Sequence, residues 1–526
     1  MKVLVSDNLS KVGIEIFEKT PGIQVDVKTG LKPEELREVI KDYDALVIRS
    51  ATKVTGDIIE AAEKLKVIGR AGIGLDNVDI SAATQKGIVV MNTPEGNTVT
   101  TAEHAIALMM SLSRNIPQAT ASLKAGKWEK KKLQGKELYS KTLGIIGAGH
   151  IGRIVADRAK GLKMNVIVYD PYVKPEVLSE LGAEGVDFDE LLRRSDYITI
   201  HTPKTPETTN LINKKTLAKM KKGAMLINCA RGGIVNEDDL YDALASGHLA
   251  GAALDVFAQE PPGKTKLMEL DNFICTPHLG ASTREAQDNV ARDVANQIVA
   301  YLLEGTITNA VNVPSISGEL VRVLKPFALL AEKMGLLQAQ LAGGGIQGID
   351  VKYAGSVSQY DSSPLTAALL KGALTPALKD EVNFVNAPVI ASERGIKVVE
   401  SKTETSEDFA SLVVSKVKTN EGEHIVSGTV FGKNIPRILR IDDFYLEAFP
   451  EGHNLLIKIK DVPGVIGEIT SSLGANGYNI ARMHVSQDKA RGENGVFLTT
   501  DSPVKDAVVS QLQCVENVLS IQRIDL

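Results

Sequence analysis

Short apolar runs alternate with amphipathic stretches along the first part of the chain. Apolar runs at residues 2–7, 45–50, 66–72 and 88–94 predict strands, and the segments PEELREVIKDY and TGDIIEAAEKL between them have helical spacing. Apolar runs separated by helical patterns are typical of parallel strands joined by crossover helices. The pattern therefore predicts a parallel sheet covered by helices.

A second alternation of the same kind begins at TLGIIGAGHIG (142–152). The predicted strands LGIIG, NVIVYD, YITIHT, AMLINCA, GAALDVF and FICTPH follow one another, and a predicted helix at 98–114 and a polar arm, KAGKWEKKKLQGKELYSK, precede them. A helix at 282–305 has a clear 3.6-residue period and is expected to pack back on the first sheet. The first 310 residues thus predict two Rossmann-like, doubly wound parallel-sheet domains.

The character of the chain changes near residues 311–319. From there to about 450 the strands are weaker and the segment is mixed, and no catalytic cluster is visible. The remainder follows the β-α-β-β-α-β order of a ferredoxin-like unit. The changes of pattern allow four domains: 1–95 together with 283–310, 96–282, 311–450 and 451–526.

Composition narrows the classes of function. The 526 residues carry 60 basic and 65 acidic side chains, a balance that argues against nucleic-acid or membrane-surface partners. No apolar run reaches the roughly 18 residues of a membrane span, and the N-terminus reads as a strand, not a signal peptide. The three cysteines are far apart, so we expect no disulfide framework, no metal site and a cytoplasmic location.

The segment GAGHIG predicts a dinucleotide site. It follows an apolar strand and opens a helix, and the next predicted strand ends in Asp170. Gly147 allows the tight turn, Gly149 lets a pyrophosphate approach the backbone, and Gly152 lets helix and strand pack closely. Asp170 can accept hydrogen bonds from a ribose diol and would repel a 2′-phosphate, which favours NAD over NADP. The alternative is a simple strand-to-helix turn.

Three polar residues follow successive predicted strands of the second alternation. Arg231 lies in NCARGGIVN, Glu260 in DVFAQEPP and His278 in CTPHLGAST. Each alone would be read as a solvated or structural side chain. Together, at the carboxyl ends of parallel strands, they supply a base, a group that orients it and a cation for a carboxylate, which is what oxidation of a 2-hydroxy acid requires.

Six motifs of the chain occur together in one enzyme family. GRAGIGLDNVD, VMNTPEGNTVTTAEHAIALM, GIIGAGHIGR, NCARGGIVNEDDL, GAALDVFAQEPP and TPHLGAST together resemble the D-isomer-specific 2-hydroxyacid dehydrogenases. The segments RSATKV and GKWEKKK and the length of the chain narrow the resemblance to the long form. That form oxidises 3-phosphoglycerate with NAD in the first step of serine biosynthesis. The resemblance implies that residues 1–95 with 283–310 bind substrate and that 96–282 bind NAD. It also implies an α+β intervening domain at 311–450 and a C-terminal regulatory ACT domain at 451–526.

The resemblance implies which residues of this chain carry out catalysis and which contact the substrate, the cofactor and an effector. Arg231, Glu260 and His278 carry over as the catalytic set, and the substrate contacts carry over to Arg49, Ser50, Arg70 and Asn97, with Lys130 of a partner subunit. The expected cofactor contacts besides the glycines and Asp170 are Ile151, Thr202, Cys229, Asp255 and Gly280, together with His150, which stands where many relatives have Arg. It also implies a homodimer or homotetramer, and L-serine as an effector near Asp461 and Asn479.

Other functions remain open at this point. Another dehydrogenase of the family, acting on glyoxylate, hydroxypyruvate or 2-hydroxyglutarate, would share the motifs but has no need of the two arginines in RSATKV and GRAGIG. A non-catalytic NAD-binding scaffold could also keep the fold. The C-terminal unit could be a dimerisation module that binds no ligand.

Overall fold

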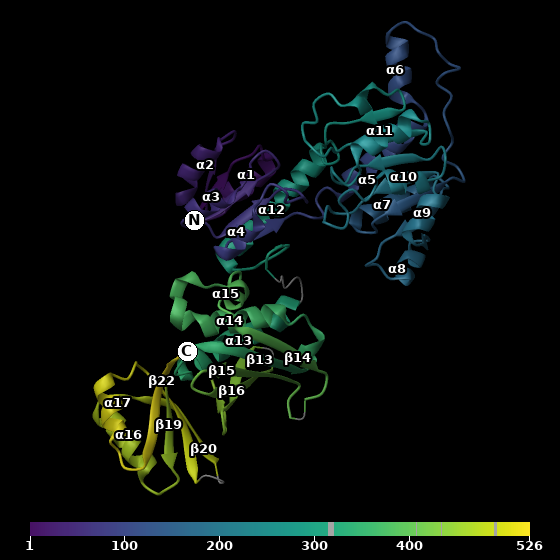
Figure 1. Ribbon diagram of the computed structural model, residues 1–526. Coiled ribbons are helices and arrows are strands. Elements are labelled where there is room, and N and C mark those ends of the chain that lie inside the picture. The colour runs from purple at the N-terminus through teal and green to yellow at the C-terminus, as the bar shows by residue number, and fades with distance from the viewer. Residues whose placement is uncertain (314–319, 407, 433, 489–491) are drawn as a thin grey trace.

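The computed structural model describes residues 1–313, 320–406, 408–432, 434–488 and 492–526, and it contains four sheets in chain order (Figure 1). We call each sheet with its helices the first, second, third and fourth unit. The predicted fold class is confirmed: two parallel doubly wound sheets precede a mixed sheet and a ferredoxin-like unit. Most of the predicted transition at 311–319 lies outside the described residues. Within them, no helix combines the length and hydrophobicity needed to cross a membrane.

The first unit is a five-stranded parallel sheet. Its strand order is β2 (Gln24–Val27), β1 (Lys2–Val5), β3 (Ala45–Ile48), β4 (Val67–Arg70) and β5 (Val89–Asn92). Its helices are α1 (Lys11–Lys19), α2 (Pro33–Val39), α3 (Gly56–Ala61), α4 (Ile80–Gln85) and α12 (Arg284–Glu304). As predicted, α12 packs on this sheet; a Cβ on Gly69 would lie 2.5 Å from the Ile298 side chain, so the glycine permits the close approach.

The second unit is a seven-stranded parallel sheet. Its strand order is β12 (Phe273–Cys275), β11 (Gly251–Leu254), β10 (Met225–Asn228), β9 (Tyr197–Ile200), β6 (Thr142–Ile146), β7 (Asn165–Tyr169) and β8 (Glu184–Gly185). Its helices are α5 (Thr98–Ser113), α7 (His150–Gly161), α8 (Pro175–Glu180), α9 (Phe188–Arg194), α10 (Lys214–Lys219) and α11 (Glu237–Ala245). The strand order reverses between β6 and β9, which is where this fold binds a dinucleotide. Helix α6 (Ile116–Lys124) and the loop after it extend from this unit as an arm (Figure 1).

The third and fourth units form the C-terminal half. The third has strand order β14 (Lys397–Thr403), β13 (Ile346–Gly355), β15 (Ser411–Thr419), β16 (Glu423–Phe431), β17 (Ile435–Ile441) and β18 (Phe444–Ala448), with α13 (Leu320–Leu341), α14 (Ser363–Leu378) and α15 (Ala387–Glu393). The fourth has β20 (Ile480–Asp488), β21 (Glu493–Thr500), β19 (His453–Lys460) and β22 (Val518–Asp525), with α16 (Val465–Ala475) and α17 (Asp506–Gln513). Short 3-10 helices lie at Ile40–Asp42, Lys266–Glu269, Ser356–Gln359 and Lys379–Glu381.

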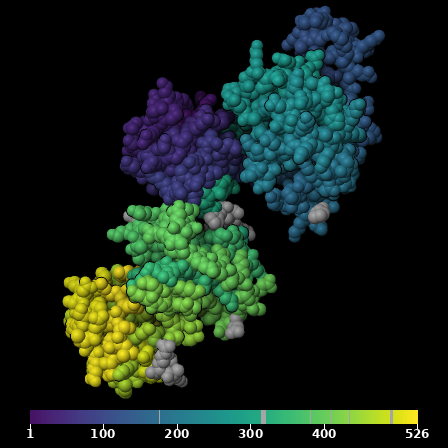
Figure 2. Space-filling view, in the orientation of Figure 1, coloured from purple at the N-terminus to yellow at the C-terminus, as the bar shows by residue number. Residues whose placement is uncertain are grey.

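The units are joined by packing as well as by the chain. One face of the fourth sheet, with Leu456, Phe497 and Ile524, belongs to the core of the third unit, and the opposite face packs on α16 and α17. The third unit also contacts the first: Asn383 Nδ2 donates a hydrogen bond to the Gly87 carbonyl at 2.8 Å. In the space-filling view, the first and second units form two separate lobes (Figure 2).

Candidate active site

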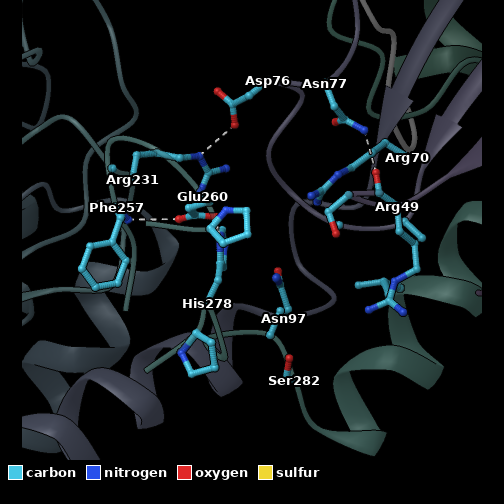
Figure 3. Close-up of a pocket in the computed structure, with 18 of the residues that line it drawn as sticks. Arg49, Arg70, Asp76, Asn77, Asn97, Arg231, Phe257, Glu260, His278 and Ser282 are labelled. Atoms are coloured by element: carbon cyan, nitrogen blue, oxygen red, sulfur yellow. Dashed lines mark hydrogen bonds and ion pairs between the residues drawn. The ribbon is translucent and has the colours of Figure 1, made fainter. Parts of the chain in front are cut away.

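A cleft of about 810 Å³ lies between the first and second units, at the carboxyl ends of both parallel sheets. The second unit contributes Arg231, Glu260 and His278, which follow the adjacent strands β10, β11 and β12. The first unit contributes Arg49 and Arg70 from the ends of β3 and β4 (Figure 3). Neighbouring parallel strands end at the same edge of a sheet, so residues far apart in sequence meet here.

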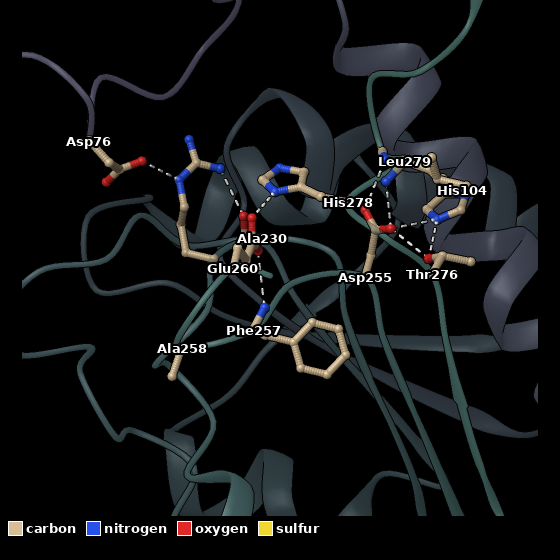
Figure 4. A network of polar contacts seen from close by, with 12 residues as sticks. Asp76, His104, Ala230, Asp255, Phe257, Ala258, Glu260, Thr276, His278 and Leu279 are labelled. Carbon is tan, nitrogen blue, oxygen red and sulfur yellow. Dashed lines mark hydrogen bonds and ion pairs between the residues drawn. The ribbon is translucent and has the colours of Figure 1, made fainter. Parts of the chain in front are cut away.

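His278 and Glu260 form a hydrogen-bonded pair. His278 Nδ1 lies 2.7 Å from Glu260 Oε2, and the Phe257 N–H donates to the other carboxylate oxygen at 3.1 Å (Figure 4). His278 has a φ of 53°, a left-handed conformation that is costly for a residue with a side chain. Its backbone N–H donates to the Asp255 carbonyl at 2.9 Å, which helps to hold this turn.

Asp255 fixes the loop that carries His278. The Asp255 side chain is almost fully buried, and its carboxylate accepts hydrogen bonds from the Leu279 and Gly280 N–H groups at 2.7 and 2.8 Å. His104 Nε2, from helix α5, lies 3.2 Å from the same carboxylate (Figure 4). Burial raises the pKa of Asp255, but hydrogen bonds from His104, Thr276 and Leu279 outweigh it and hold the pKa below its usual range. The carboxylate therefore stays ionised.

Three arginines make the cleft electropositive. Arg49 and Arg70 enter from the first unit and Arg231 from the second, on the opposite side (Figure 3). Burial, followed by the charge of Arg231, lowers the pKa of Arg70 to about 10, so Arg70 remains charged at neutral pH. Mutual repulsion between arginines is relieved when an anion binds between them.

Two buried polar atoms in the cleft lack a partner among the described residues. They are Arg70 Nε and Asn97 Oδ1. Asn97 as a whole is 8% exposed, and both residues line the cleft. A buried donor or acceptor without a hydrogen bond costs roughly 1–3 kcal/mol, which a polar ligand would recover. The cleft is therefore suited to a small, multiply charged anion.

The glycine loop has the geometry that a dinucleotide requires. Gly147 has a φ of 97°, a Cβ on Gly149 would meet nothing within 4 Å, and a Cβ on Gly152 would lie 2.0 Å from the Gly147 carbonyl oxygen. The Asp170 carboxylate lies beside the loop and accepts a hydrogen bond from the Ala148 N–H at 2.7 Å. Each glycine thus does what the motif predicts: a tight turn, open space and close packing.

Residues beside the loop also fit a cofactor. Thr202 Oγ1 and His201 Nδ1 are buried without a hydrogen-bond partner in the described part of the chain. Burial lowers the pKa of His201 to about 4, so its ring is neutral. His150 is exposed at the first position of α7, and Ile151 follows it. Cys229 and Gly280 are buried, and each lies two residues from a catalytic candidate, Arg231 and His278 respectively. The donor and acceptor set fits NAD.

Two groups of predicted residues lie elsewhere. Lys130 is exposed on the arm and is not among the residues that line the cleft of its own chain. Asp461 follows the end of β19, where its carboxylate accepts a hydrogen bond from Asn494 Nδ2 at 2.8 Å. Asn479 precedes β20 at the opposite end of the sheet, because Ile480 pairs with Thr500 and Thr500 pairs with His453. One chain therefore does not bring Asp461 and Asn479 together.

Three residues at the site were not predicted from the sequence. Asp76 and Asn77, from the loop after β4, line the cleft, and Asp76 contacts Arg231. His104, in helix α5, pairs with Asp255, which is 151 positions away in the sequence. Asp76 and Asn77 belong to the GIGLDNVD motif, which could have drawn attention to them. His104 likewise belongs to the VMNTPEGNTVTTAEHAIALM motif, although its partner Asp255 is far away in sequence.

Comparisons with known proteins agree with this geometry. Residues 106–280 match the family model for the D-isomer specific 2-hydroxyacid dehydrogenase NAD binding domain, residues 323–442 that for the D-3-phosphoglycerate dehydrogenase intervening domain, and residues 453–515 that for the ACT domain. The chain is 47% identical to the D-3-phosphoglycerate dehydrogenase of Synechocystis over 98% of this chain and 93% of that one. It is 46% identical to the enzyme of the same name from Archaeoglobus fulgidus over the full length of both.

Solved structures resemble the first two units. The NAD-dependent formate dehydrogenase of Staphylococcus aureus, in complex with NAD, is 32% identical, with a TM-score of 0.54 over 60% of this chain and all of that one. A glyoxylate reductase from Paecilomyes thermophila is 31% identical, with a TM-score of 0.55 over 59% of this chain and 98% of that one. The resemblance predicted from the motifs is confirmed, and the chain belongs to the D-3-phosphoglycerate dehydrogenases of the NAD-dependent D-isomer specific 2-hydroxyacid dehydrogenase family.

Proposed function

We propose that this protein oxidises 3-phospho-D-glycerate to 3-phosphohydroxypyruvate with NAD, the first step of L-serine biosynthesis. The observation that carries the proposal is one cleft with a His–Glu pair on one wall and three arginines around it. A substrate with a phosphate at one end and a carboxylate at the other needs cations at both ends, and arginine forks suit both groups.

His278 acts as the base in this proposal. Glu260 accepts a hydrogen bond from Nδ1–H, which fixes the ring orientation and leaves the Nε2 lone pair to take the proton of the substrate hydroxyl. As the ring gains that proton, the Glu260 carboxylate stabilises the charge. Arg231 binds the substrate carboxylate and polarises the C2 oxygen.

The cofactor would lie along the second unit. Gly147, Gly149 and Gly152 leave room for the pyrophosphate at the start of α7, and Asp170 accepts hydrogen bonds from the ribose. Thr202, Cys229 and Asp255 carry further proposed contacts, with Asp255 acting chiefly through the 278–280 loop that it holds. NAD, when bound, supplies the acceptor for the C2 hydride.

Arg49 and Arg70, with Ser50 and Asn97, are assigned to the phosphate end. We expect Arg70→Ala to raise KM for 3-phosphoglycerate about 10- to 100-fold, because a charge-assisted pair in a largely desolvated site is lost, while kcat changes less. Steady-state kinetics measures both constants, and Arg37→Ala, on the exposed face of α2, is the charge-matched control. An unchanged KM would remove Arg70 from the substrate site.

The activity itself is tested by NADH formation from 3-phosphoglycerate and NAD while the product is trapped. Turnover that inorganic phosphate inhibits is the expected result, since phosphate competes for the arginine cluster. Faster oxidation of 2-hydroxyglutarate with NAD, or faster reduction of glyoxylate with NADH, would point to another dehydrogenase of the family. NAD binding without turnover on any 2-hydroxy acid would point to a scaffold.

We also propose that L-serine is an effector of the fourth unit. β19 has eight residues, so Asp461 and Asn479 lie roughly 25 Å apart in one chain at 3.3 Å per residue. A serine site that uses both must therefore form between two copies. The NADH assay with added serine, followed by calorimetric titration, tests this; no binding would leave the unit as a dimerisation module.

A homodimer or a dimer of dimers fits the exposed arm. Helix α6 buries none of its residues, and Trp128 is 82% exposed. We propose that the arm packs on the second unit of another copy and brings Lys130 to that copy's cleft. We expect Leu123→Lys with Trp128→Lys to dissociate this contact, because the charges oppose burial. Size-exclusion chromatography with light scattering reports the mass; Tyr172→Lys, at another exposed aromatic, is the control.

The four-way division of the chain remains a prediction. Its support is that each proposed domain, 1–95 with 283–310, 96–282, 311–450 and 451–526, holds one of the four sheets.

A further inference from the structure

Besides Glu260, which pairs with His278, the cleft contains a second acidic residue among its arginines. Asp76, in the loop after β4, lies on the first unit, and its Oδ2 is 3.2 Å from Nε of Arg231 on the second unit. The pair therefore spans the cleft (Figure 3). An acid beside a site for a multiply charged anion weakens the attraction for that anion, so its presence calls for a separate function.

The hydrogen bonds of Arg231 indicate that function. A guanidinium has five N–H donors in a fixed plane. Nε donates to Asp76, and Nη1 donates to the Ala230 carbonyl at 2.8 Å. Two of the five N–H donors are thus paired with protein acceptors, which sets the plane of the guanidinium. The remaining Nη donors are left for a ligand. The Nη2 group lies beside the loop of the first unit, at the wall of the cleft.

The same loop gives Arg231 room on its other side. A Cβ built on Gly74 would lie 2.1 Å from Arg231 Nη2 and 3.0 Å from the Asp76 carboxylate. Only glycine leaves this space. The segment from Gly74 to Asp76 therefore encloses the end of a side chain that belongs to the other unit.

We propose that Asp76 is a positioning residue: it holds the Arg231 guanidinium from across the cleft so that the Nη edge faces the substrate carboxylate. This rests on the role proposed for Arg231. The proposed function requires only that residue 76 offers a hydrogen-bond acceptor to Arg231 Nε. The negative charge of Asp76 is not required, and it weakens the binding of an anion. Because the two residues lie on different units, the correct orientation of Arg231 also depends on the spacing of the two units.

The test compares two variants of the full-length protein. Asp76→Ala removes the acceptor and the charge, whereas Asp76→Asn removes the charge and keeps an amide oxygen for Arg231 Nε. We expect kcat of Asp76→Ala to fall about two- to fivefold, the range of a partly exposed ion pair, with KM unchanged or lower. Asp76→Asn should recover kcat. Asp57→Asn, an acid in the first turn of α3, controls for the net charge of the first unit.

Gly74→Ala reaches the same point by another route. The added methyl meets the flexible end of Arg231 and the Asp76 carboxylate, so the unfolding temperature should stay within a few degrees of the wild type while kcat falls. A wild-type kcat in Asp76→Ala, or equal losses in the Ala and Asn variants, would overturn the proposal. A wild type inactive on 3-phosphoglycerate would instead contradict the proposed function, and the same comparison would then use the hydroxy acid that the wild type does oxidise.

Discussion

We expect a His278→Ala variant to turn over its substrate about 10²–10⁴-fold more slowly than the wild type while it binds NAD with unchanged affinity. The imidazole is the group placed to take the hydroxyl proton, and the carboxylate of Glu260 is 2.7 Å from its Nδ1. Without the ring, the Glu260 carboxylate keeps its hydrogen bond from the Phe257 N–H, but the imidazole that takes the hydroxyl proton is lost. Steady-state NADH formation and calorimetric titration with NAD measure the two quantities.

The backbone at this position needs a control of its own. His278 has a φ of 53°, which alanine adopts less readily than asparagine. His278→Asn should therefore keep the turn, lose the base and lose as much activity as His278→Ala. Near-normal turnover in either purified variant would remove His278 from the chemistry. Recovery in His278→Asn alone would make the residue a backbone element instead of a base.

The second large effect is expected at Arg231. Arg231→Ala should lower kcat/KM about 10²–10⁴-fold, because it removes both the partner of the carboxylate and the group that polarises the C2 oxygen. Arg231→Lys keeps the charge but not the planar fork, so it should recover only part of this loss. A lysine variant as active as the wild type would mean that charge alone is needed. Calorimetric titration with NAD checks that the second unit is intact.

Much of the fold was predictable because strands buried on both faces are continuously apolar. The runs that form β1, β3, β4 and β5 are almost entirely buried in the structure. Strand β2 was missed because its sequence, QVDV, alternates and lies at the exposed edge of the sheet. None of the six strands of the third unit was predicted individually, since their amphipathic pattern, as in SLVVSKVKT, gives a weaker signal than an apolar run.

Some residues of the site could be predicted from the sequence and others could not. Arg231, Glu260 and His278 were predicted because each follows a recognisable strand, and the topology of a parallel sheet then brings them together. Asp76 was missed because its partner lies 155 positions away on another unit. Interactions of this kind depend on how two sheets face each other across a cleft, which no local pattern encodes. The separation of Asp461 from Asn479 also needed the strand register.

The two-sided sheet of the fourth unit decides where this chain can be divided. A cut near residue 450 would bare Leu456, Phe497 and Ile524 on one fragment and the apolar surface that covers them on the other. Each fragment would then expose a contiguous apolar surface to water, which favours aggregation. A gene fragment meant to isolate the C-terminal half should start before α13, so that the third and fourth units are expressed as one piece.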